Sequence, residues 1–120
     1  MADAKSRYIR MLKIELDDLR DDLQVLIDDC CTREKRHEST HYVCMENMAV
    51  FKREILDVNT VDHILDRIEV DEYADVDALA RALDDRFGEL ARRHGITDAV
   101  YSMLRRRLEK LAGYIGASPE

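Results

Sequence analysis

Residues 8–56 of the chain read YIRMLKIELDDLRDDLQVLIDDCCTREKRHESTHYVCMENMAVFKREIL, a stretch that contains no glycine and no proline. Apolar and amphipathic side chains recur in it at steps of three and four residues, with one gap of seven. This is the spacing of one face of an α-helix. The stripe consists of Ile9, Leu12, Leu16, Leu19, Leu23, Leu26, Cys30, His37, His41, Cys44, Met48, Phe51 and Ile55.

The stretch allows either one very long helix or an antiparallel helical hairpin. A single helix of about 49 residues would be roughly 73 Å long, whereas a compact chain of this size has a radius of gyration of about 14 Å. Thr32 could cap a second helix that begins at Arg33, within the polar middle of the stripe. The length therefore favours the hairpin. The unbroken phase of the stripe favours one helix that protrudes or pairs with a second chain.

The second half of the chain also predicts helices. Thr60 can cap a short helix that leads into an acidic connector, and Thr97 can cap the last helix. Gly95 stands where a helix commonly ends in a left-handed conformation. We therefore expect an all-α bundle of four to five helices with antiparallel hairpins. It forms one domain, residues 1–120: a long helix or hairpin at 1–57, a short helix and acidic connector at 58–74, and a helical hairpin at 75–116.

Composition agrees with a small helical protein. Charged residues make up 38% of the chain and hydrophobic residues 46%, with one proline and four glycines. No apolar run approaches the roughly 20 residues that span a bilayer, and the first residues lack the apolar core of a secretion signal. Three cysteines are an odd number that suits reduced thiols. These features predict a cytoplasmic protein without a membrane segment.

The net charge of −7 is unevenly distributed along the chain. Residues 54–85 carry 11 acidic and 2 basic side chains, whereas residues 86–117 carry 3 acidic and 7 basic ones. Such segments can pair within one fold, pair across a dimer or steer a partner, and we favour pairing within the fold. The acidic balance also opposes non-specific capture of DNA.

Residues 37–41, His-Glu-Ser-Thr-His, match the pattern H-E-x-x-H and in this look like the zinc-metalloprotease motif. On a helix, His37 and His41 would share a face with Cys44, and imidazole with thiolate is good zinc chemistry. However, Lys35 and Arg36 place positive charge before the motif, and no strand is available to hold a peptide substrate. We therefore expect no catalysis and no cofactor, with zinc binding by these three residues as an alternative to simple packing.

Residues 87–107 resemble the helix-turn-helix of bacterial transcriptional regulators. Ala91 stands four residues before Gly95, and the apolar positions of that motif are also filled. The resemblance implies DNA binding in which Arg105, Arg106 and Arg107 would meet phosphates. An antiparallel hairpin with a glycine turn explains the same residues, with the arginines on a solvated face.

The long stripe carries more apolar length than the later helices can cover within one chain. We therefore predict a helical interaction or assembly protein that forms a homodimer and binds a protein partner not identified by the sequence. Aromatic residues and methionines are enriched at such contacts. The side chains expected at the interface are Tyr8, Met11, Tyr42, Met45 and Phe51.

Overall fold

The computed structural model describes residues 3–117 and shows an all-α helical bundle, as predicted. No strand occurs among these residues. The elements are α1 (Ala4–Lys35), α2 (His41–Asp66), a short 3-10 helix η1 (Val70–Glu72), α3 (Val76–Arg92) and α4 (Asp98–Ala117).

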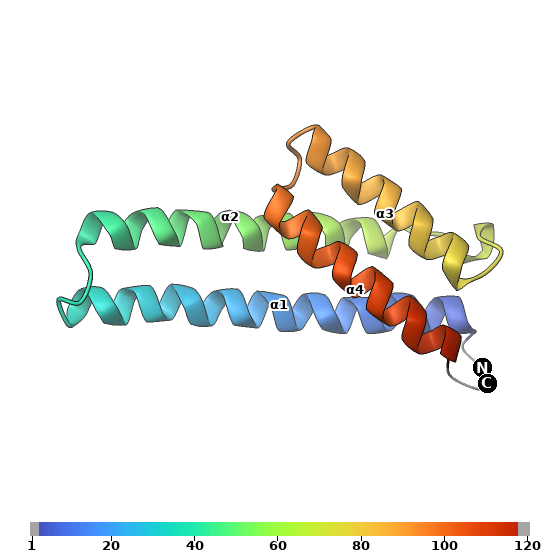
Figure 1. Cartoon of the computed structure of the whole chain (residues 1–120), viewed down its shortest axis with the longest axis horizontal. Helices are drawn as coiled ribbons and strands as arrows, with labels where there is room; N and C mark the ends of the chain where they lie inside the picture. Colours follow the sequence, from blue (N-terminus) through green and yellow to red (C-terminus); the bar gives the residue numbers. More distant parts are fainter. Residues whose placement is uncertain (1–2, 118–120) are drawn as a thin grey trace.

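The first half of the chain is a hairpin in which α1 and α2 lie antiparallel along their lengths (Figure 1). The single long helix is not observed, because the chain turns at residues 36–40. Thr32 lies inside α1, so its predicted role as a cap is wrong. Thr40 caps α2 instead, and its hydroxyl accepts a hydrogen bond of 3.2 Å from the Val43 amide.

The turn between α1 and α2 closes without a glycine. His37 adopts the left-handed conformation with φ of 60°. Its amide donates to the Glu34 carbonyl at 3.0 Å, and the Glu38 amide donates to the Arg33 carbonyl at 2.9 Å. These two bonds form the Schellman arrangement that satisfies the last carbonyls of a helix. Because histidine replaces glycine here, the sequence carries no ordinary turn signal at this point.

Helix α2 continues through the boundary that the sequence predicted at residues 58–60. Thr60 is exposed, and its hydroxyl donates to the Leu56 carbonyl one turn earlier at 3.1 Å, which a helix interior accommodates. Val58, Val61 and Leu65 continue the buried face of α2. The separate short helix expected within residues 58–74 is therefore wrong, because burial outweighs the capping tendency of one threonine. The acidic connector follows α2 as expected.

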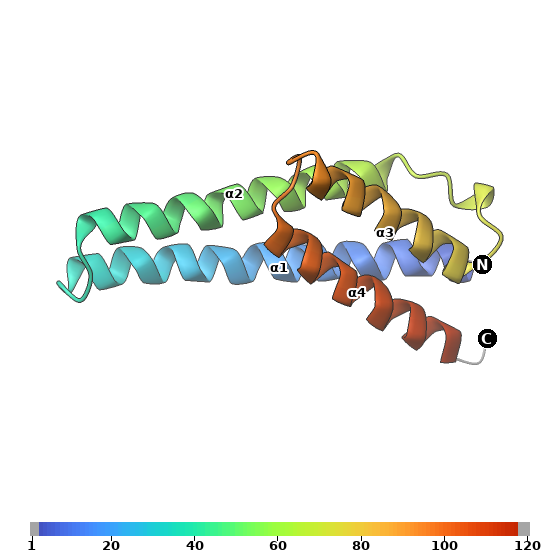
Figure 2. The same ribbon diagram turned by 45° about the horizontal axis from the view of Figure 1, so that its top comes forward.

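Helices α3 and α4 form a second, shorter antiparallel hairpin that covers one half of the first (Figure 2). Asp75 caps α3 by accepting a 2.8 Å hydrogen bond from the Ala78 amide. The Tyr8 hydroxyl donates to the Leu108 carbonyl at 3.0 Å and so joins α1 to α4. The core residues shared by the helices are Tyr8, Leu12, Leu16, Leu19, Leu23, Val58, Val61, Leu79, Leu83, Phe87, Ile96, Val100, Leu104, Leu108 and Leu111.

Two sequence expectations within the helices need correction. Leu26 is 44% exposed, and Ile27 takes the buried place beside Leu23 and Cys30. At the end of α3 it is His94, not Gly95, that adopts the left-handed conformation with φ of 60°. The Gly95 amide donates to the Leu90 carbonyl at 2.8 Å, so glycine occupies the position after the left-handed residue.

The molecule is elongated because the second hairpin covers only part of the first. Its dimensions are 54 × 31 × 20 Å and its radius of gyration is 16.8 Å, against about 14 Å for a compact chain of this length. We call the uncovered part of the α1–α2 hairpin, residues 24–56, the arm. The remainder, in which α3 and α4 pack on α1 and α2, is the head.

The charged segments pair within the fold. Lys13 of α1 lies 3.4 Å from Asp62 and also pairs with Asp66, both in the acidic segment. Glu15 of α1 pairs with Lys110 and lies 3.7 Å from the Arg107 guanidinium in the basic segment. Within residues 3–117, each charged segment thus forms ion pairs with α1, and the expected ion pairs between the acidic and the basic segment are not seen.

Candidate functional site

The arm exposes apolar side chains that a folded monomer normally buries. Within residues 24–56 only Ile27, Cys30 and Cys44 are buried, because the arm is just two helices thick. Contiguous apolar exposure of this kind marks interaction surfaces. Seven large apolar side chains of the arm are at least 44% exposed: Val25, Leu26, Tyr42, Val43, Met45, Val50 and Leu56.

One set of exposed residues forms a second stripe along α2, separate from the face that contacts α1. We call it the α2 stripe: Tyr42, Met45, Ala49, Lys52 and Leu56. Its steps of three, four, three and four residues are those of a helix-pairing seam. Tyr42 is 69% exposed and Leu56 62%. The next positions in the same series are Asn59 and His63, so the apolar character of the stripe ends where the head begins.

A groove between α1 and α2 lies beside this stripe near its Leu56 end. It has a volume of about 370 Å³ and is lined by Gln24, Ile27, Lys52, Ile55 and Leu56. Three of these five residues are aliphatic. The groove and the stripe therefore form one surface that combines a ridge with a hollow.

A second uncovered face of the arm lies on the same side as the head. Val43 and Val50 precede Asp57 by fourteen and seven residues, which places all three on one side of α2. Asp57 binds the head, because its carboxylate accepts a 3.0 Å hydrogen bond from the Thr97 amide. This face is covered at Asp57 and open at Val43 and Val50. The arm thus offers two distinct surfaces to a partner.

The inside of the arm holds a cluster of sulfur atoms. The Cys44 thiol donates to the Cys30 carbonyl at 3.3 Å and lies 3.6 Å from the Met48 sulfur. The Cys31 sulfur lies 3.8 Å from the same Met48 sulfur. Burial raises the pKa of the Cys44 thiol to about 11, and the nearby Glu34 carboxylate adds to the shift. Cys44 therefore fills the contact between α1 and α2 as a neutral thiol.

The two histidines of the H-E-x-x-H pattern do not lie on one helix. His37 belongs to the turn after α1, and His41 is the first residue of α2. The His41 Nδ1 atom pairs with Glu34, which holds the pKa of that carboxyl below its ordinary value. Both histidines are exposed and line an open depression of about 760 Å³ on the turn, whereas Cys44 is buried inside the arm.

The predicted arrangement of His37, His41 and Cys44 on one helical face is therefore wrong, because the chain turns between the first two. Within residues 3–117, no three or more histidine, cysteine, aspartate or glutamate side chains are grouped as a metal site would need. Zinc binding by these residues stays a prediction.

Residues 87–107 form the end of α3, a turn and the start of α4. The two helices lie antiparallel beside each other in both views (Figures 1 and 2), whereas a helix-turn-helix sets its helices at a wide angle. Arg105 lies 3.5 Å from Glu109, and Arg107 pairs with Glu15 and donates to the Met103 carbonyl at 3.0 Å. Arg106 is exposed. The hairpin alternative describes this segment, and DNA binding by the three arginines stays a prediction.

The five side chains expected at an interface fall into three groups. Tyr8 is fully buried in the core, so its predicted place at a surface contact is wrong. Its ring lies on the α1 face that α4 covers. Met11 and Phe51 are half-buried against the core. Tyr42 and Met45 are exposed on the arm and belong to the α2 stripe.

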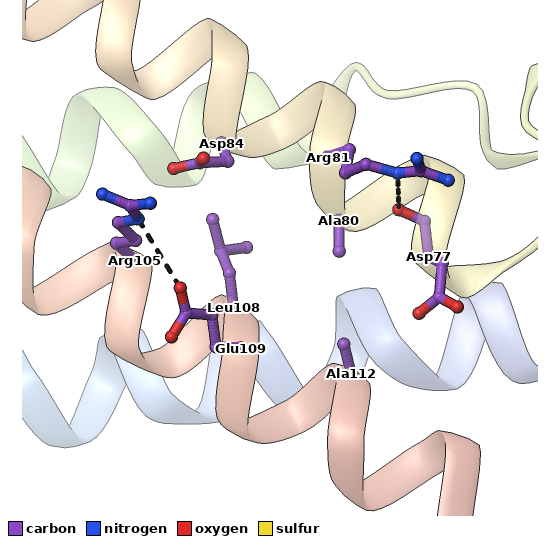
Figure 3. A pocket seen from close by; sticks show the side chains of 8 residues that line it. All are labelled: Asp77, Ala80, Arg81, Asp84, Arg105, Leu108, Glu109 and Ala112. Carbon is purple, nitrogen blue, oxygen red and sulfur yellow. Dashed lines mark hydrogen bonds and ion pairs between the residues drawn. The ribbon is translucent and has the colours of Figure 1, made fainter.

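A shallow groove on the head is the alternative candidate for a ligand site. It lies between α3 and α4 and has a volume of about 450 Å³. Figure 3 shows Ala80 and Ala112 facing each other across it, so their small side chains leave the space. Arg105 pairs with Glu109 of its own helix, and Arg81 donates to the Asp77 carbonyl at 3.4 Å. Asp84 accepts a 2.8 Å hydrogen bond from the Tyr101 hydroxyl of α4. The charged groups therefore have separate partners instead of converging on one point.

The sequence contains a signal for the α2 stripe that the first stripe conceals. Tyr42, Met45, Ala49 and Leu56 have helical spacing, but the more regular stripe of Cys44, Met48, Phe51 and Ile55 runs between them. Two interleaved stripes on one helix indicate contacts on two sides. Only the structure shows that α1 covers the series of Cys44, Met48, Phe51 and Ile55 and that the α2 stripe remains exposed.

Comparison of the chain with known protein families, with characterised proteins and with solved structures finds no match. None of the described helices combines the length and apolar character needed to cross a membrane.

Proposed function

We propose that this protein is a non-catalytic helical assembly protein of the cytoplasm that forms a homodimer through its arm. The observation that carries the proposal is the uncovered state of the arm, where Tyr42, Met45, Val50 and Leu56 are each more than half exposed. When another helical surface covers this much exposed apolar surface, the free energy of the two-helix hairpin falls.

The division of the molecule into head and arm supports the same proposal. The head has a core built from all four helices and supports the base of the hairpin. The arm adds length without adding a core of its own beyond Ile27, Cys30 and Cys44. A segment that contributes little to the stability of the monomer but presents an ordered apolar surface suits assembly.

Sedimentation equilibrium over a wide concentration range tests the proposal. We expect the native chain to dimerise and the double variant Met45→Glu/Val50→Glu, which places charge on both open faces of the arm, to be monomeric. Ile14→Glu is the matched control, because Ile14 is 57% exposed on α1 outside the arm. We expect this control to remain dimeric.

Circular dichroism of each variant confirms that the helices persist. A native chain that stays monomeric at every concentration up to its solubility limit would overturn the proposal. A double variant as dimeric as the native chain would overturn the role of the arm.

A further inference from the structure

We propose that the sulfur atoms of Cys31, Cys44 and Met48 form a binding site for one copper(I) ion inside the arm. The site lies between α1, which carries Cys31, and α2, which carries the other two residues. All three ligands belong to one chain, so the inference does not depend on the dimer of the proposed function.

The sulfur atoms lie at separations that suit ligands of one metal ion. The Met48 sulfur is 3.8 Å from the Cys31 sulfur and 3.6 Å from the Cys44 sulfur. A bond from a metal to a thiolate sulfur is about 2.3 Å long, so sulfurs that share an ion at trigonal or tetrahedral angles lie about 3.8–4.0 Å apart. The two observed separations therefore suit a shared ion without a shift of either helix.

The backbone brings the ligands together from both helices. Cys44 and Met48 stand four residues apart, so they project from the same face of α2. The Cys44 thiol donates to the Cys30 carbonyl at 3.3 Å, which places its sulfur against the α1 backbone directly beside Cys31. The Met48 side chain is long and unbranched, so its sulfur can adjust to the ion. Two ligands are thus held by packing and the third is adaptable.

The donor set selects copper(I) over zinc. Thiolate and thioether sulfurs are soft ligands that suit copper(I), whereas zinc is bound by thiolate, imidazole and carboxylate groups. The thioether of Met48 is therefore the ligand that distinguishes this site from the predicted zinc site of His37, His41 and Cys44.

Binding exchanges protons for the ion and transfers no electron. Each of the two thiols releases its proton to solvent and binds the ion as a thiolate, while the Met48 sulfur binds as a neutral donor. The site then carries one net negative charge. A coordinating metal deprotonates a thiol outright, which overcomes the burial that raises the pKa of Cys44.

The ion has a path from solvent to the site. Cys44 is buried, whereas Cys31 and Met48 are each partly exposed. An ion therefore meets the two partly exposed sulfurs first, and Cys44 completes the coordination from inside the arm.

An anaerobic titration of the full chain with copper(I) tests the proposal. The chelator bathocuproine disulfonate competes for the ion and reports by its colour how much copper it holds. We expect each native chain to retain one copper(I) ion against the chelator. X-ray absorption at the copper edge should show three sulfur neighbours.

Matched variants of methionine and cysteine identify the ligands. Met48→Leu keeps an apolar side chain of similar size and should weaken copper binding at least about tenfold, since even outer partners of a metal site matter by about 10–100-fold. Met45→Leu, the same change at an exposed position one turn earlier, should bind as the native chain does. Cys31→Ala and Cys44→Ala should abolish binding, whereas Cys30→Ala should retain it. Circular dichroism of each variant confirms that the helices persist.

Each other outcome overturns a defined part of the inference. A native chain that yields all its copper to the chelator would show that the sulfurs only pack. Native affinity in Met48→Leu, or loss of binding in Cys30→Ala but not in Cys31→Ala, would overturn the ligand set. A chain that binds zinc more tightly than copper(I) would overturn the choice of metal. A native monomer that retains copper would overturn the proposed function and support this inference.

Discussion

The two turns of the molecule have the same local structure and different surroundings. The turn after α1 contains Arg36, His37 and the capping Thr40, and the turn after α3 contains Arg93, His94 and the capping Thr97. Both histidines have φ of 60°, and both turns carry the same pair of backbone hydrogen bonds. Local chemistry therefore gives two helical hairpins of one kind.

Their surroundings differ at the position before the capping threonine. In the turn after α3 this residue is Ile96, which is 1% exposed in the core of the head. In the turn after α1 it is Ser39, at the free end of the arm. Asp57 of α2 also binds the second turn through the Thr97 amide. One turn is thus held by tertiary packing and the other only by its own bonds, which leaves the arm free to meet a partner.

The largest effect should come from the position that distinguishes the two turns. We expect Ile96→Ala to lower the free energy of unfolding by about 3 kcal/mol, because it removes a fully buried aliphatic side chain. Ser39→Ala at the equivalent position should change it by less than about 0.5 kcal/mol. Urea denaturation of the two variants measures both values. Similar losses at the two positions would show that the turns are equally packed.

The next largest effect concerns Asp57, the one buried charged residue within residues 3–117. Its carboxylate accepts hydrogen bonds of 3.0 Å from the Arg53 guanidinium and from the Thr97 amide. Asp57→Ala leaves the Thr97 amide without this acceptor, and we expect a loss of about 2 kcal/mol in the free energy of unfolding.

Asp57→Asn is the control for this prediction, because it keeps one oxygen to accept from the Thr97 amide. Its loss should be clearly smaller than that of Asp57→Ala. Equal losses would show that the charge, and not the bond to the turn, is what matters. Amide exchange of Thr97 by nuclear magnetic resonance reports the bond directly.

The sequence predicts the helices of the fold better than its turns. Helical spacing alone identifies the helical segments and most core positions, because burial of one face requires that spacing. It fails at the first turn, since His37 provides the left-handed residue that glycine usually provides. It also fails at residues 58–60, where capping residues lie inside a helix that is stabilised by packing.

The candidate interface could be predicted only in part. Tyr42 and Met45 were expected on it and are exposed, whereas Tyr8 has the same chemical character and is buried. The difference depends on which part of the first hairpin α4 covers, and no local pattern in α1 encodes that. Zinc binding was suggested by a spacing that requires a continuous helix, and the turn at residues 36–40 removes that condition.

A smaller effect, of opposite sign, should come from the left-handed histidines. This conformation costs a non-glycine residue about 1 kcal/mol or more, while glycine adopts it freely but loses more chain entropy on folding. We therefore expect His37→Gly and His94→Gly each to raise the free energy of unfolding by about 0.5–1 kcal/mol. Thermal denaturation of the two variants checks the values. A gain in only one variant would show that the surroundings, and not the shared backbone conformation, determine the strain.

The smallest effect should be a dependence on pH at the ends of α1 and α3. Arg92, and then Arg93, lower the pKa of Glu89 below its ordinary value of 4.5, and His41 lowers the pKa of Glu34. A carboxyl whose pKa is lower in the folded state contributes stability above its ordinary pKa. It loses that stability as the pH falls through the lowered value. Glu89→Gln should therefore be less stable than the native chain at pH 7. The two should be equally stable once the pH is low enough to protonate Glu89 in both the folded and the unfolded native chain.

Glu34→Gln should follow the same course, because the pKa of Glu34 is also lowered in the folded state. The stability lost in each variant relative to the native chain should be present at pH 5 and pH 8 and should disappear as the pH falls through the lowered pKa. Urea midpoints at pH 3, 5 and 8 measure both. A Glu34→Gln variant as stable as the native chain at pH 5 and pH 8 would show that the pair with His41 does not stabilise the end of α1.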